Sequence, residues 1–102
     1  MSSPTPEADA PSATLTLTLT MVNRRGLHAR AAARFVRTLE VYEADVRVMR
    51  DGHAVDGRSI MGLLMLGAPC GGSVDVMLVG EDAEAAAAAL VHLVESGFGE
   101  DE

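Results

Sequence analysis

The feature that most constrains the fold is a strict alternation of threonine with apolar residues near the start of the chain. The alternating residues are Thr14, Leu15, Thr16, Leu17, Thr18, Leu19, Thr20 and Met21. A period of two places the apolar side chains on one face of a β-strand and the β-branched threonines on the other. We therefore expect a half-buried strand at 14–21, in a sheet with one covered face.

Later segments continue this pattern and add helices. Apolar residues at helical spacing indicate a helix over 29–39, a short helix over 60–66 and a final helix after Gly80. Alternation indicates strands near 44–48, 54–56 and 74–78. Helices with one apolar stripe can cover one face of an antiparallel sheet. The order β-α-β-β-α-β-α thus predicts an α+β fold, a two-layer open-faced sandwich in which three helices cover one face of a four-stranded antiparallel sheet.

Length and composition predict one small domain. The chain has 102 residues, of which 48% are hydrophobic, and this suits a single core. Residues 1–13 are rich in Pro, Ser, Ala and acid, so we expect a disordered N-terminal arm. Residues 99–102 are expected to form an acidic tail, which leaves 14–98 as the domain. The single cysteine, Cys70, excludes an internal disulfide and favours a cytoplasmic location.

Charge and hydropathy argue against other broad classes. No apolar stretch approaches the roughly 18 residues of a membrane span, and the N-terminus has no basic residues before an apolar run. A formal net charge of -7 argues against nucleic-acid binding. No cluster has metal-ligand spacing, so neither a metal nor a cofactor is expected.

Five arginines nevertheless crowd one short stretch of this acidic chain: Arg24, Arg25, Arg30, Arg34 and Arg37. They would suit a partner with an acidic rim, and we expect Arg30 and Arg34 to contact it. The alternative is that the arginines only form the solvated face of a helix.

His28 is the residue best suited to carry chemistry, because it stands where a loop becomes a helix. The partial positive charge of a helix N-terminus favours a neutral, nucleophilic ring over an imidazolium. The free backbone N–H groups there also suit phosphoryl oxygens, and Arg30 can add a charge-assisted hydrogen bond. The alternative is that His28 only caps the helix.

A second candidate region begins at Ser59. A serine before a short helix is ordinarily an N-cap, although the helix N-terminus would also favour a phosphate on its hydroxyl. Ile60, Met61 and Leu64 give the following helix an apolar surface. This surface either docks a partner or completes the core.

Two motifs in register resemble a known family. Gly26-Leu27-His28-Ala29-Arg30 resembles the active-site motif of HPr, the phosphocarrier of bacterial phosphotransferase systems. Residues 58–67 are similar to the family's regulatory-serine segment, and the likeness covers about 15–97. The resemblance implies that enzyme I, with phosphoenolpyruvate as the ultimate donor, phosphorylates His28 on Nδ1 beside Arg30. The phosphoryl group would then pass to an enzyme IIA-type protein.

The resemblance also implies regulation. Ser59 matches the serine that an ATP-dependent HPr kinase/phosphorylase modifies in some bacteria, which hinders transfer through the histidine. The three apolar residues named after it match the family's docking surface. Many members have proline where this chain has Ala31, but proline is only favoured in a first helical turn, so no reactive group is lost. The run 23–33 resembles the variant associated with nitrogen-related or regulatory phosphotransferase systems, which would make the relay regulatory.

Other classes remain open from the residues alone. A phosphoryl carrier does not turn over by itself, so "enzyme" is a generous label for it. The main alternative is a non-carrier binding module switched by phosphorylation at Ser59, in which His28 is silent. A ligand-binding module would need a pocket with convergent polar groups, and a hydrolase would need a triad; the sequence indicates neither. We expect a monomer, because a carrier of this size must present one face to several partners in turn.

Overall fold

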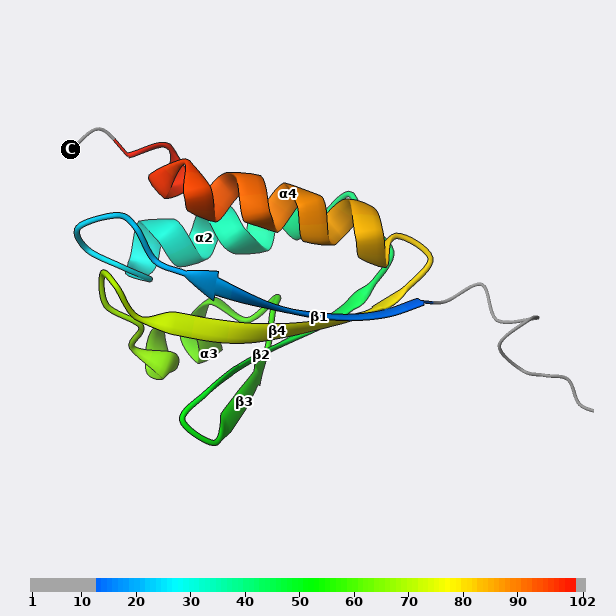
Figure 1. The fold of residues 1–102 in the computed structure, drawn as a ribbon, viewed down its shortest axis with the longest axis horizontal. Helices are drawn as coiled ribbons and strands as arrows, with labels where there is room; N and C mark the ends of the chain where they lie inside the picture. Colours follow the sequence, from blue (N-terminus) through cyan, green and yellow to red (C-terminus); the bar gives the residue numbers. More distant parts are fainter. Residues whose placement is uncertain (1–12, 101–102) are drawn as a thin grey trace, which may run out of the picture.

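The computed structural model describes residues 13–100. In chain order they form β1 (Ala13–Thr20), α2 (Ala29–Leu39), β2 (Asp45–Arg50), β3 (His53–Asp56), α3 (Ile60–Leu66), β4 (Ser73–Gly80), α4 (Ala83–Glu95) and a 3-10 turn, η1 (Gly97–Gly99). The strands make one antiparallel sheet in the order β1-β4-β2-β3. Helices α2 and α4 lie side by side over this sheet (Figure 1), and α3 contacts β2, β3 and α2. The predicted open-faced sandwich is confirmed.

The alternating pattern produces the two faces of the sheet as expected. In β1 the threonines are exposed, Leu19 is buried, and Leu15 and Leu17 are half-buried against the core. The register pairs Leu17 with Val76 and Leu19 with Val74 of the central strand β4, so apolar rows continue across the covered face. The opposite face is uncovered and carries polar pairs between the same two strands.

The core lies between the sheet and the helices. Its largest fully buried side chains are Phe35, Phe98, Met21, Leu39, Leu63, Leu78 and Leu90. Helix α3 contributes Leu63 and Leu66 to this cluster, so its remaining side chains are available for the surface. All three helices therefore contribute apolar residues to one shared core.

Local signals in the sequence fix several element ends. The Ser59 Oγ accepts the Gly62 N–H at 2.9 Å, which confirms Ser59 as the N-cap of α3. Gly67 ends α3 with φ of 64°. Asp51 and Gly52 both have positive φ, as a tight hairpin turn between β2 and β3 requires.

The chain ends differ from the expectation. Residues 1–12, most of the predicted arm, and 101–102 of the predicted tail lie outside the described residues. Ala13 is not part of an arm but the first residue of β1, where it pairs with Gly80. The structure also places Gly99 and Glu100 in contact with α2 and its N-cap instead of in a tail. The described fold therefore includes Ala13, Gly99 and Glu100 in addition to the expected range 14–98.

Candidate functional site

His28 is the N-cap of α2, as the sequence predicted, and a tightly packed loop holds it there. Gly26 precedes it with φ of 63°, and a Cβ on Gly26 would lie 2.3 Å from the carbonyl oxygen of Ala68. The same carbonyl accepts the Leu27 N–H at 2.9 Å. Contacts with the loop after α3 therefore fix the backbone that leads into His28.

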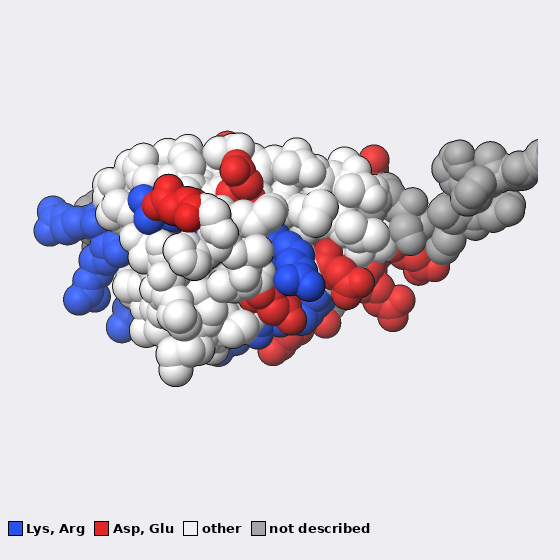
Figure 2. Space-filling view, turned by 90° about the horizontal axis from the view of Figure 1, so that it is seen from below, with Lys and Arg blue, Asp and Glu red and all other residues white. Residues whose placement is uncertain are grey.

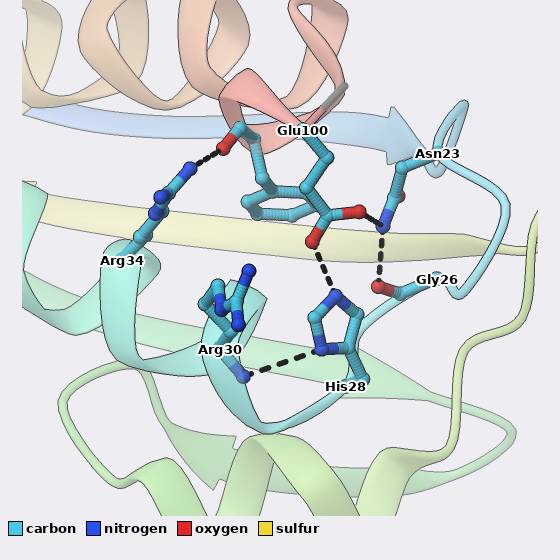
Figure 3. Close-up of polar contacts among 7 residues, drawn as sticks. Asn23, Gly26, His28, Arg30, Arg34 and Glu100 are labelled. Carbon is cyan, nitrogen blue, oxygen red and sulfur yellow. Dashed lines mark hydrogen bonds and ion pairs between the residues drawn. The ribbon is translucent and has the colours of Figure 1, made fainter. Parts of the chain in front are cut away.

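The two ring nitrogens of His28 face partners of opposite character (Figure 3). Nδ1 accepts the backbone N–H of Arg30 at 3.3 Å, and Nε2 pairs with Oε2 of Glu100. A backbone N–H can only donate, so Nδ1 must present its lone pair to it. An ionised carboxylate can only accept, so Nε2 must carry the proton. This arrangement selects one tautomer and leaves the nucleophilic lone pair on Nδ1, at the helix N-terminus.

A left-handed turn at the end of the chain brings Glu100 to the ring. Gly97, Phe98 and Gly99 have φ of 67°, 59° and 71°. A left-handed conformation at a non-glycine residue costs about 1–2 kcal/mol, and complete burial of the Phe98 ring offsets that cost. The Arg34 Nη1 donates to the Phe98 carbonyl and holds the turn against α2. Arg34, expected to contact a partner, thus also has a structural contact within the chain.

Asn23 joins this carboxylate to the loop. Its Nδ2 donates to the Gly26 carbonyl at 2.8 Å and to Oε1 of Glu100 at 3.1 Å. Sequence reasoning missed both residues, because Asn23 follows the expected strand 14–21 with no pattern that gives it a chemical role, and Glu100 falls within the expected acidic tail 99–102. The glycines around Phe98 were the one signal of a tight turn that could have directed attention to Glu100.

The site opens into a basic hollow of about 450 Å³. Its lining includes His28, Glu100 and four of the five crowded arginines, namely Arg24, Arg25, Arg30 and Arg34. Basic side chains gather at the left end of the molecule in Figure 2, and most of the visible acidic side chains lie toward the other half. The surroundings of His28 are therefore locally basic, although the chain as a whole is acidic.

The expected docking surface lies beside this basic end. Ile60 is 41% and Met61 69% exposed, whereas Leu64 is half-buried against the core. Met65, which sequence reasoning did not include, is 78% exposed. A broad uncharged surface adjoins the basic end in Figure 2. Helix α3 thus presents at least three apolar side chains to solvent, next to the cap residue Ser59.

Two kinds of feature are absent from the described part of the chain. None of its helices has the length and apolar character needed to cross a membrane. Between residues 13 and 100, His, Cys, Asp and Glu side chains form no group of three that could hold a metal ion.

Known proteins resemble this chain over most of its length. The family profile described as "PTS HPr component phosphorylation site" matches residues 15–96. Phosphocarrier protein HPr of Cupriavidus necator is 40% identical over 82 residues, which cover 80% of this chain and 92% of that protein. HPr of Pseudomonas aeruginosa is 44% identical over 83 residues, with 80% of this chain and 92% of that protein covered.

Solved structures agree with the sequence comparison. A crystal structure of HPr from Thermoanaerobacter tengcongensis superposes with a TM-score of 0.81 at 41% identity, and covers 86% of this chain and 99% of that one. HPr from Bacillus anthracis gives a TM-score of 0.76 at 34% identity, with 80% and 98% covered. Together with the sequence motifs and the fold, these matches show that the chain belongs to the HPr family of phosphocarrier proteins of the phosphotransferase system.

Proposed function

We propose that His28 accepts a phosphoryl group on Nδ1 from enzyme I, with phosphoenolpyruvate as the ultimate donor, and passes it to an enzyme IIA-type protein. The observation that carries this proposal is the pairing of the ring: the Arg30 N–H faces Nδ1, and the Glu100 carboxylate faces Nε2. Family membership supplies the donor and acceptor classes.

The transfer is a displacement at phosphorus. The Nδ1 lone pair forms a new N–P bond as the bond between phosphorus and the donor atom of enzyme I breaks, and the bonding pair stays on that donor atom. The proton remains on Nε2, where the Glu100 carboxylate stabilises the positive charge that develops on the ring. Once Nδ1 carries the phosphoryl group, it no longer accepts the Arg30 N–H, so this N–H can donate to a phosphoryl oxygen. The Arg30 side chain lines the same hollow and can bind a second oxygen.

Intact-protein mass spectrometry tests this proposal. The chain is incubated with enzyme I, phosphoenolpyruvate and Mg²⁺, and wild type is compared with His28→Ala. His53→Ala is the matched control, because His53 is an exposed residue at the start of β3. We expect one acid-labile phosphoryl group on wild type and on the control, and none on His28→Ala. No gain on wild type, with enzyme I active on another HPr, would favour the non-carrier binding module instead.

Ser59 is proposed as a regulatory site for an HPr kinase/phosphorylase. Its hydroxyl caps α3, so a phosphate there would be electrostatically compatible with the helix N-terminus and would not need to unfold it. The neighbouring Arg58 guanidinium is engaged with the carbonyls of Leu39, Tyr42 and Ala44. A new double negative charge beside exposed Met61 would oppose apolar docking. Ser59→Asp should therefore slow phosphorylation of His28, and an unchanged rate would contradict this role.

The remaining parts of the proposal follow from the family and from the sequence run 23–33. We expect a monomeric cytoplasmic carrier in a nitrogen-related or regulatory relay, with Arg30, Arg34 and the surface of α3 contacting its partners. Transfer from the phosphorylated chain to a nitrogen-type and to a sugar-type IIA protein can be compared directly. Faster transfer to the sugar-type protein would overturn the assignment of the relay.

A further inference from the structure

We propose that Asn23 is a positioning residue that holds the Glu100 carboxylate on His28 and thereby fixes which ring nitrogen is nucleophilic. This inference rests on the proposed function, because it concerns the same histidine. Asn23 does not touch the reacting nitrogen, and it acts through Glu100.

Burial is the first observation. Asn23 is 3% exposed and is the one buried polar side chain within residues 13–100. Its Oδ1 has no hydrogen-bond partner among the described residues. Burial of an amide with an unmatched acceptor opposes folding, and an apolar side chain of similar shape would avoid that penalty. The chain tolerates this penalty, which indicates that the Nδ2 donor of Asn23 is required.

The contacts of that donor are the second observation. Nδ2 lies between the Gly26 carbonyl at 2.8 Å and Oε1 of Glu100 at 3.1 Å (Figure 3). Both partner oxygens can only accept a hydrogen bond, so the amide must point Nδ2, and not Oδ1, toward them. Gly26 also accepts the His28 N–H and donates its own N–H to the Asn23 carbonyl at 3.1 Å. One side chain therefore ties the loop before His28 to the carboxylate that faces the ring.

The division of Glu100 between two partners is the third observation. Oε1 takes the Asn23 amide and Oε2 takes Nε2 of His28. A glutamate side chain has three rotatable bonds, so its carboxylate can adopt many orientations unless contacts fix it. The Asn23 donor fixes the plane of the carboxylate, so Oε2 remains directed at Nε2. Nε2 then keeps its proton and Nδ1 keeps its lone pair.

Asn23→Leu separates this role from a purely structural one. Leucine matches asparagine in shape and removes the donor without adding charge. We expect the variant to fold, because the unmatched Oδ1 is removed and the Gly26 carbonyl still accepts the His28 N–H. Nitrogen-15 chemical shifts of the unphosphorylated His28 ring report the ratio of Nε2–H to Nδ1–H tautomers. We expect that ratio to fall about tenfold, the usual consequence of losing a hydrogen bond to a charged group, and phosphorylation to slow in parallel.

A second measurement applies even if that variant does not fold. Asn23 is the one asparagine in the chain, which has no glutamine, so its side-chain NH₂ pair is the one carboxamide signal in a nitrogen-15 spectrum. Glu100→Ala should move this pair and increase its exchange with water, whereas Glu95→Ala, at an exposed position of α4, should not. An unmoved NH₂ pair, or a wild-type ring pattern in folded Asn23→Leu, would overturn the inference. Both readouts use unphosphorylated protein, so a failure of the proposed carrier function would appear separately, as absent phosphorylation of wild type.

Discussion

Substitution of Gly26 by alanine should damage both the fold and the site, and a second glycine provides the control. Gly26 and Gly67 have nearly equal φ values, 63° and 64°, so alanine at either position is held in the same strained region. A Cβ at Gly67 meets nothing within 4 Å, whereas one at Gly26 lies 2.3 Å from the Ala68 carbonyl oxygen. The two variants therefore differ in steric overlap and share the backbone strain.

The magnitudes follow from these two terms. Left-handed strain costs an alanine about 1–2 kcal/mol, which is the expected loss for Gly67→Ala. Displacement of packed backbone adds about 1–3 kcal/mol, so Gly26→Ala should lose about 2–5 kcal/mol. With a urea dependence of about 1–2 kcal/mol/M for a small domain, this difference of about 1–3 kcal/mol should place the midpoint of Gly26→Ala about 0.5–3 M below that of the control.

Circular dichroism in urea measures the difference, and mass spectrometry at low temperature measures phosphorylation of the folded fraction. The Ala68 carbonyl accepts the Leu27 N–H, so its displacement should also move His28 and slow phosphorylation in Gly26→Ala alone. Equal losses of stability in the two variants, within about 0.5 kcal/mol, would refute the tight loop contact on which the site geometry depends.

Three further predictions concern the surface of α3, the N-cap of α3 and the buried ring of Phe98. Met61→Ala should change the free energy of unfolding by less than about 0.5 kcal/mol, because its side chain is exposed, but should weaken binding of enzyme I. Leu63→Ala, at a fully buried position, should lower the free energy of unfolding by about 2–5 kcal/mol. A binding titration and a urea curve on each variant measure these effects, and unchanged binding by Met61→Ala would remove α3 from the interface. Ser59→Ala should cost about 1 kcal/mol through loss of the cap to Gly62. The control Ser96→Ala removes an exposed hydroxyl that donates to the Leu93 carbonyl of the preceding helix, and should cost less than about 0.5 kcal/mol. Equal urea midpoints would contradict the capping role. Phe98→Ala should cost about 3–5 kcal/mol in thermal unfolding and release Glu100 from His28, and retention of the wild-type His28 ring signals would contradict that coupling.

Elements with a regular period were predictable from sequence. The bounds of α2 and α3 match the expected 29–39 and 60–66, because an apolar stripe and a recognisable N-cap mark each of them. The strand bounds differ from the expected ones by one or two residues. For example, β1 spans 13–20 instead of 14–21, because Met21 bonds to Gly71 and Gly72, which precede the first residue of β4. Such differences arise where backbone pairing, and not side-chain pattern, decides the end of an element.

The site was predictable only in its local part. Short motifs of adjacent residues were enough to predict His28, Arg30 and the cap at Ser59 as candidates. Glu100 lies 72 positions from His28 and reaches it only because three left-handed residues reverse the chain. No periodicity encodes such a contact, and the acidic composition of the last residues favoured a tail. Long-range contacts made by single polar side chains therefore required the structure.

The most direct test of the account is the identity of the phosphorylated atom. The chain with nitrogen-15 in its histidines is phosphorylated by enzyme I and phosphoenolpyruvate, and phosphorus–nitrogen correlation identifies the bonded ring nitrogen. We expect a single phosphoryl group on Nδ1 of His28, with the proton retained on Nε2 opposite Glu100. A phosphoryl group on Nε2 of His28, or on His53 or His92, would contradict it.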